Sequence, residues 1–279
     1  MLGVGLALAA SLCWGLGDFI GGSKSRVLPV LVVLIYSQLV GLVWIGGVAL
    51  IAQDPVPDTR EIALAALSAV AGTAGLVCFF RAIAIGKMSL VVPIAATAAV
   101  VPVVVGIATG DRPSELQLFG MAVALAGAVM ASREPGAEGE RGSLAAGVLL
   151  AALSALFIGF FFLAIDGASD GGAVWASLVN RITSVTLLLV AVAAIRPPLT
   201  GVGPHLPALA GAGTLDVSAN LLFAAASTKG LISLVSVAGS LYPVITVLLA
   251  RVVLKERVHR IQEAGVVAAL GGVVLIAAG

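Results

Sequence analysis

Charged side chains stand inside apolar stretches of this sequence that would otherwise suit a lipid bilayer. Asp18 interrupts SLCWGLGDFIGG, residues 11–22, and Arg81, Arg181 and Asp216 interrupt three other apolar runs. A charge that faces lipid is costly, so such residues nearly always face the interior of a helix bundle and pair there. The two acids and two arginines balance one another. The acids are also the candidates for carrying a proton, because arginine effectively never releases one.

Helical spacing groups these charges with neutral polar side chains. Trp14 lies one turn before Asp18, and Asn220 one turn after Asp216, so each pair shares a helix face. Such polar stripes describe a wet central cavity better than a dry core. The candidate residues for substrate binding or coupling are Trp14, Asp18, Gln38, Arg81, Arg181, Asp216, Asn220 and Tyr242.

Some of these residues also have a purely structural interpretation. Gln38 and Asn220 are suited to interhelical hydrogen bonds worth about 0.6 kcal/mol each. Tyr242 is suited to packing. Asp18 and Arg81 fall at equal depth in two spans that run in the same direction, so a salt bridge between them is expected if their helices are neighbours.

The sequence lacks the features of an enzyme. The only histidines, His205 and His259, stand alone in separate loops, without metal-ligand spacing or a nucleophile elbow. A phosphate-binding loop of the Walker type is also missing, so ATP does not drive the protein from this chain. We therefore expect no enzyme activity, no metal and no cofactor. A net charge of +1 with scattered charges predicts no nucleic-acid partner.

The composition places the helices that carry these residues in a membrane. The chain is 60% hydrophobic and 10% charged, with a mean hydropathy of +1.17, far from the composition of soluble globular proteins. A span needs roughly 20 apolar residues. We therefore predict an all-α membrane protein with ten transmembrane helices. The predicted spans cover about residues 2–22, 30–51, 62–85, 89–109, 115–132, 143–165, 173–195, 206–229, 232–252 and 261–278.

The sequence repeats once about its polar midpoint. Residues 1–134 hold the first five spans, 135–142 form a polar linker, and 143–279 hold the other five. The halves align through AIAIGKMSLVVP with AASTKGLISLVS, and through GDRPSELQLFGMAVALAG with KERVHRIQEAGVVAALGG. Because five is odd, the second half must cross the membrane in the opposite direction. Secondary transporters use such inverted repeats to place a site near the midplane.

Glycines spaced two turns apart favour close packing of the last helix of each half. They are Gly120 and Gly127 in the fifth span, and Gly265 and Gly272 in the tenth. The two copies are fused in one chain, so we expect these helices to pair within the bundle. This favours a monomer, with a homodimer as the alternative.

Several of these motifs together resemble a known group of carriers. The WG and DF pairs of the first span, the Gly-x-x-Ser turn at Gly86, and the acid–arginine pairs at Asp111 and Glu256 are similar to those of the drug/metabolite transporter superfamily, in its ten-helix EamA type. The resemblance covers the whole chain in two copies. It implies a carrier of small metabolites in the cell membrane, often an exporter of amino acids or toxic compounds.

The two halves differ where the polar groups of the first span lie. Ile158 and Phe162 align with Trp14 and Asp18, so neither the aromatic residue nor the acid is duplicated. We therefore expect an asymmetric function on a symmetric scaffold.

These observations predict a secondary transporter that exports an amino acid or drug-like compound by alternating access. Its partners would be a small-molecule substrate, the lipid bilayer, and protons carried by Asp18 or Asp216, with passive uniport as the other coupling mode. Arginine and aspartate in one cavity would suit a zwitterion. A passive channel or a membrane assembly subunit is the alternative, although neither needs an inverted repeat with an asymmetric polar centre.

Two indications of membrane orientation conflict. The excess of basic residues on one side would make that side cytoplasmic and place both termini outside, whereas the family resemblance implies both termini inside. A reporter enzyme fused at Gly139, active only outside the cytoplasm, distinguishes the two. The basic residues are Lys24, Arg26, Lys87, Arg133, Arg141, Arg196, Arg251, Lys255, Arg257 and Arg260 on one side, and Arg60, Arg112 and Lys229 on the other.

Overall fold

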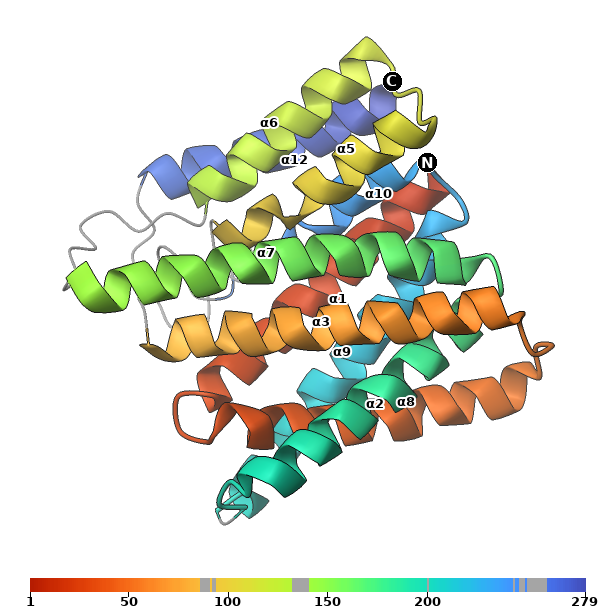
Figure 1. The fold of residues 1–279 in the computed structure, drawn as a ribbon. Helices are drawn as coiled ribbons and strands as arrows, with labels where there is room; N and C mark the ends of the chain where they lie inside the picture. Colours follow the sequence, from red (N-terminus) through yellow and green to blue (C-terminus); the bar gives the residue numbers. More distant parts are fainter. Residues whose placement is uncertain are drawn as a thin grey trace.

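The computed structural model describes residues 1–85, 91, 94–131, 141–199, 201–242, 244–245, 249 and 260–279. Every regular element within these ranges is a helix, which confirms the all-α prediction (Figure 1). The elements are α1 (Leu2–Lys24), α2 (Val30–Ala52), α3 (Thr59–Ile85), η1 (Ala96–Ala99), α5 (Val100–Thr109), α6 (Glu115–Ala131), α7 (Arg141–Ser169), α8 (Ala173–Ile195), η2 (Gly203–His205), α9 (Leu206–Ser227), α10 (Ile232–Gly239) and α12 (Arg260–Ala278).

In the described part of the chain, 6 helices are long and apolar enough to cross a membrane. They are α1, α2, α3, the Ala146–Ser169 part of α7, α8, and the Gly203–Ser227 segment. All coincide with predicted spans. The predicted spans 115–132 and 261–278 correspond to α6 and α12. Parts of the spans 89–109 and 232–252, most of the linker 135–142, and the motif residues Gly86 and Glu256 lie outside the described residues, so the count of ten stays a prediction.

The described helices pack in pairs, and each pair joins a helix of the first half of the chain to a helix of the second half. The most extensive contacts join α1 to α9, α3 to α7, α2 to α8 and α6 to α12. Figure 1 shows α6 beside α12 and α3 beside α7. A two-fold rotation that carries α1 onto α7 and α3 onto α9 would turn the first pair into the second and leave the other pairs unchanged. This pairing is therefore the one expected of two repeats related by a two-fold axis.

Glycines allow the backbones of α6 and α12 to come into direct contact. A Cβ added at Gly120 would lie 2.9 Å from the carbonyl oxygen of Gly272, and one at Gly127 would meet the carbonyl oxygen of Gly265 at 2.7 Å. Real Cβ atoms do not approach backbone this closely, because a well-packed interface leaves no room for one more methyl group. The predicted pairing of these glycine faces within the bundle is confirmed.

This interface gives a stability prediction with a control on the neighbouring residue. We expect Gly272→Ala to lower the melting temperature of the purified protein, because its Cβ would lie 2.6 Å from the carbonyl oxygen of Gly120. Gly271 has open space where its Cβ would lie. Gly271→Ala should therefore be neutral or stabilising, by up to about 1 kcal/mol from helix propensity. Equal melting temperatures for the two variants would contradict the α6–α12 contact.

Two helix breaks lie at corresponding places in the two halves. The 3-10 turn η1 precedes α5, and α10 ends at Gly239, before a turn at Ser240 and Leu241. Both breaks fall within predicted spans. Such interrupted spans mark the binding region of many transporters, because they leave backbone groups free to line a cavity.

Each break packs on a glycine in the first helix of the opposite half. A Cβ added at Gly15 of α1 would lie 2.8 Å from the carbonyl oxygen of Tyr242. One added at Gly159 of α7 would lie 2.8 Å from the carbonyl oxygen of Ala98. These two contacts are counterparts in the sequence repeat. They bring the broken segments against the helices that carry Trp14 and Asp18 on one side and Ile158 and Phe162 on the other.

Candidate functional site

A central cavity lies where polar and aromatic side chains of both halves meet. It encloses about 600 Å³ of space, counting its open mouth. Helices α1, α2, α3, α7, α8 and α9 and the segment after α10 contribute to its walls. The lining residues are Trp14, Asp18, Gln38, Gly72, Thr73, Leu76, Phe79, Ile158, Phe161, Phe162, Asn180, Arg181, Ser184, Asp216, Asn220 and Tyr242.

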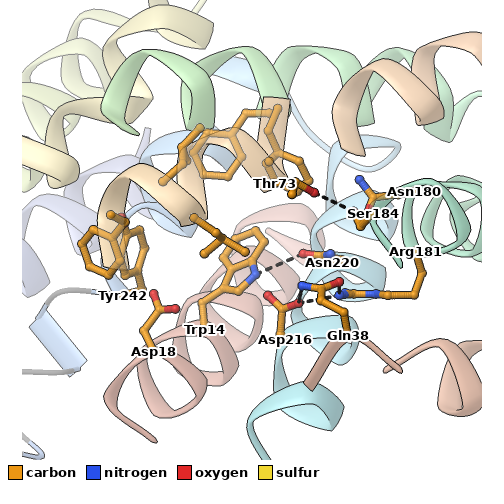
Figure 2. A pocket seen from close by; sticks show the side chains of 16 residues that line it. Trp14, Asp18, Gln38, Thr73, Asn180, Arg181, Ser184, Asp216, Asn220 and Tyr242 are labelled. Atoms are coloured by element: carbon orange, nitrogen blue, oxygen red, sulfur yellow. Dashed lines mark hydrogen bonds and ion pairs between the residues drawn. The ribbon is translucent and has the colours of Figure 1, made fainter. Parts of the chain in front are cut away.

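A buried ion pair forms one end of the cavity (Figure 2). Nη1 of Arg181 lies 2.8 Å from Oδ2 of Asp216, and it also donates a hydrogen bond to Oε1 of Gln38. Nε2 of Gln38 donates to the same Asp216 oxygen at 3.3 Å. These three side chains come from α8, α9 and α2. Together they give Nη1 of the guanidinium an ionic and a hydrogen-bonding partner within the membrane.

Two glycines make room for this cluster at the crossing of α2 and α9. A Cβ at Gly213 would overlap the backbone carbonyl of Ser37, so the two helices touch backbone to backbone. A Cβ at Gly41 would lie 3.3 Å from Nε of Arg181. The guanidinium is therefore packed against α2, and Arg181 is 1% exposed.

Trp14 forms the middle of the cavity wall. Its Nε1 donates a hydrogen bond of 3.1 Å to Oδ1 of Asn220. Its ring packs at centroid distances of 6.1 Å from Phe161, 5.8 Å from Phe162 and 5.5 Å from Phe223. A buried indole needs a partner for its N–H and favours tilted contacts with other rings. These contacts fix the orientation of Trp14 beside Asp18.

The hydrogen bond to Trp14 gives a test of Asn220. We expect Asn220→Leu to leave the protein folded but to reduce transport several-fold, because the buried indole N–H would lose its acceptor, a loss of about 1–3 kcal/mol in local stability. The tryptophan emission spectrum and the transport rate measure the effect. Asn220→Gln, which keeps a neutral amide oxygen as acceptor, is the conservative control. Unchanged transport in the leucine variant would show that Asn220 only makes an interhelical contact and has no role in transport.

Asp18 lies at the Tyr242 end of the cavity, apart from the ion pair (Figure 2). It is half-buried, and no residue in the described part of the chain donates a hydrogen bond to it or forms a salt bridge with it. A second cavity adjoins the first between α1, α2, α3 and α9, and it shares Asp18, Gln38, Leu76 and Asp216 with it. Asp18 therefore lines both cavities.

Neutral polar groups join α3 to α8 along another wall. Oγ1 of Thr73 donates to Oγ of Ser184 at 3.1 Å, and Nδ2 of Asn180 donates to Oγ of Ser68 at 2.8 Å. Thr73, Asn180 and Ser184 line the cavity. They give it hydroxyl and amide groups in addition to its charges.

The structure brings together all the predicted site residues except Arg81. Trp14, Asp18, Gln38, Arg181, Asp216, Asn220 and Tyr242 line the one cavity, and the part that each takes in transport stays a prediction.

Arg81 is exposed and forms no salt bridge with Asp18, although both belong to the described residues. The expected pairing is wrong because it used depth alone. Arg81 follows the cavity residue Phe79 by two positions, about 200° around the helix, and so faces outward. The buried ion pair joins Arg181 to Asp216 instead.

Sequence reasoning missed the apolar part of the lining. Phe79, Phe161 and Leu76 lie in spans where most residues are apolar, so hydropathy carries no signal for them. Asn180 was detectable, because it is a polar residue beside Arg181 in an apolar span. Ile158 and Phe162, the repeat counterparts of Trp14 and Asp18, line the same cavity. The asymmetry of the two halves therefore lies within the site itself.

Comparison with known proteins agrees with this architecture. The sequence profile of the EamA-like transporter family matches residues 1–133 and 145–278. A solved structure titled "Crystal structure of protein" is 16% identical, with a TM-score of 0.82 over 99% of this chain and 98% of that chain, and so shares the fold. A search of curated proteins gives no match. Because the family profile covers nearly the whole sequence in two copies, the chain belongs to the EamA-like transporter family, whose members are membrane transporters.

Proposed function

We propose that this protein is a secondary transporter that exports a small metabolite, an amino acid or a drug-like compound, across the cell membrane. The observation that carries the proposal is the central cavity, in which acidic, basic, amide and aromatic side chains converge from helices of both halves. The protein acts as a carrier without a cofactor and performs no enzymatic reaction.

We further propose that the protein has ten transmembrane helices in two inverted repeats of five. The repeats are residues 1–134 and 143–279, joined by the linker 135–142. The α1–α9 and α3–α7 contacts support this arrangement, because a two-fold rotation between the halves would turn one pair into the other. So does the correspondence of the contacts at Gly15 and Gly159. Two copies of one scaffold in opposite orientation have two equivalent conformations, one open to each side.

Alternating access would then follow from motion of the two broken segments. Each break rests on a glycine beside the cavity, so a small rotation there moves the rest of its span without disturbing the tightly packed α6–α12 pair. A passive channel or an assembly subunit would need neither paired breaks nor a cavity with groups of both charges.

Asp18 is the proposed coupling residue. It has no partner in the described part of the chain, and it faces both the central cavity and the adjoining one. Asp216, by contrast, is held by Arg181 and Gln38. A carboxylate that can be reached from two spaces and lacks a fixed counter-charge can exchange a proton with either.

The experiment combines a binding screen with a flux measurement. A thermal-shift screen of the purified protein with amino acids, polyamines and cationic drugs identifies compounds that bind the folded state. Proteoliposomes that enclose a pH-sensitive dye then report whether each binder moves protons. We expect at least one binder to move protons in wild type. Binders that are neither exchanged nor coupled to proton movement would contradict the proposal.

We expect Asp18→Asn to abolish substrate-driven proton movement even at substrate concentrations that saturate the variant, because asparagine cannot take up a proton. Asp170→Asn is the control, since Asp170 is a surface carboxylate with a side chain 70% exposed. Proton movement that persists in Asp18→Asn would place coupling elsewhere, whereas substrate exchange without any proton movement in wild type would indicate passive uniport.

A further inference from the structure

The charged groups most accessible to a substrate in the central cavity are carboxylates, although the cavity also contains an arginine. Asp18 is half-buried and has no hydrogen-bonding or ionic partner among the described residues. The side chain of Asp216 is 21% exposed, while that of its partner Arg181 is 1% exposed. The carboxylate of Asp216 is therefore more accessible from the cavity than the guanidinium, although both side chains line it.

Arg181 is held as an internal counter-charge. Its Nη1 contacts both Asp216 and Gln38. Its Nε and Nη2 are buried and have no partner in the described part of the chain. Gly41 packs against Nε, and a Cβ added at Gly41 would lie 3.3 Å from this nitrogen. The contact with Gly41 leaves no space for an anionic group of a substrate at Nε.

Among the described residues, one carboxylate is consequently left without a counter-charge. Arg181 balances Asp216, so the charge of Asp18 remains. In a space with little water this charge favours a bound cation, because charges attract more strongly at low dielectric constant. A molecule with a single positive charge would make the cavity neutral.

The aromatic wall next to Asp18 suits the body of such a molecule. Trp14 is one turn before Asp18 on the same helix, and Phe161 and Phe162 pack on its ring. Aromatic faces attract cations and bind apolar groups. The carboxylate and the rings together form a site for an ammonium group attached to an apolar or aromatic body.

We propose that the cavity selects organic cations: a protonated amine at Asp18, with its apolar or aromatic body against Trp14. This inference rests on the proposed function and narrows it. A zwitterionic α-amino acid binds more weakly, because its carboxylate is attached to the carbon that carries the ammonium group and would lie close to Asp18. A compound whose only charge is a carboxylate is excluded.

The test uses three probes with the same ring and different charge. They are 2-phenylethylamine, a cation; phenylalanine, a zwitterion; and 3-phenylpropionate, an anion. Isothermal calorimetry on the purified wild-type protein gives a Kd for each. We expect the amine to bind at least tenfold more tightly than phenylalanine, and the anion to show no binding at millimolar concentration.

Two variants assign the selectivity to Asp18. Asp18→Asn should weaken amine binding at least tenfold and bring the Kd values of the amine and phenylalanine close together. Asp170→Asn removes an exposed carboxylate and should leave all three values unchanged. The wild-type comparison needs no variant, so the proposal is tested even if Asp18→Asn does not fold.

Phenylalanine or 3-phenylpropionate binding as tightly as the amine would overturn the inference, as would no amine binding at millimolar concentration. If phenylalanine binds tightly and is exchanged by proteoliposomes, the proposed function stands and the charge selectivity fails. If the amine binds with the expected preference but no compound is exchanged, the selectivity stands and the transport function fails.

Discussion

Replacing Arg181 by glutamine is expected to lower the free energy of unfolding by up to about 3–5 kcal/mol, because it leaves the partly buried carboxylate of Asp216 without its counter-charge. Asp216 would lose the 2.8 Å contact with Nη1, and Gln38 would lose a hydrogen-bond donor. The loss appears as a lower melting temperature of the purified protein in detergent.

A double variant separates this charge effect from a loss of packing. Neutralising Asp216 as well, in Arg181→Gln with Asp216→Asn, should recover most of the stability. Arg60→Gln is the control, because Arg60 is 68% exposed and its contacts with Glu61 and Asp170 at 3.6 and 3.8 Å are on the surface; such pairs contribute at most about 1 kcal/mol. If Arg181→Gln melted at the same temperature as wild type, the stabilising role of the Arg181–Asp216 ion pair would be contradicted.

Replacing Gly213 by valine is expected to have a comparable effect for a steric reason. Even a Cβ at this position would overlap the backbone carbonyl of Ser37, and neither backbone can yield without separating α2 from α9. Overpacking costs about 1–3 kcal/mol, and more where backbone must move. The separation would also lengthen the hydrogen bond from Gln38 to Asp216, so substrate binding should weaken together with stability.

The control lies one half-turn away on the same helix. Gly211 has no atom within 4 Å of its added Cβ. Gly211→Val should therefore melt close to wild type and keep its transport activity. If Gly213→Val behaved like Gly211→Val, the close crossing of α2 and α9 would be refuted.

Much of the scaffold was predictable because lipid restricts the choice of structure. A bilayer requires long apolar helices, so the bounds of α1, α2 and α8 followed from hydropathy within a few residues. The packing of α6 on α12 followed from glycine spacing, since small residues at one face allow close approach. In both cases one physical requirement determined the pattern.

The polar half of the site was predictable and the apolar half was not. Asp18, Asp216 and Asn220 stand out because the sequence around them is apolar, and helical periodicity placed them on the correct faces. Phe161 gives no such signal. For a cavity residue that is as apolar as the lipid-facing positions, only the tertiary arrangement of helices distinguishes the two.

Arg81 shows what a depth argument leaves out. Its position along α3 matches that of Asp18 along α1, but the angle around the helix determines whether it meets the bundle interior. The inward face of α3 carries Gly72, Thr73, Leu76 and Phe79, and Arg81 lies opposite that face. The pairing of Arg181 with Asp216 needed the crossing of α8, α9 and α2, which no local pattern encodes.

We expect the cavity to open to the two sides of the membrane in turn, and a single cysteine tests this without knowledge of the substrate. Thr73 lines the cavity, and Cys13 and Cys78 are the only native cysteines. In a Cys13→Ala, Cys78→Ala background, Thr73→Cys would be treated with a membrane-impermeant maleimide in sealed vesicles of either orientation. Val190→Cys, at a position 64% exposed on the outer face of α8, is the control, because a thiol in lipid forms no reactive thiolate. We expect Thr73→Cys to be labelled from each side while the vesicles stay closed to the reagent, and Val190→Cys to be labelled from neither side. Labelling of Thr73→Cys from one side only, or passage of the reagent into the vesicles as through a channel, would contradict this expectation.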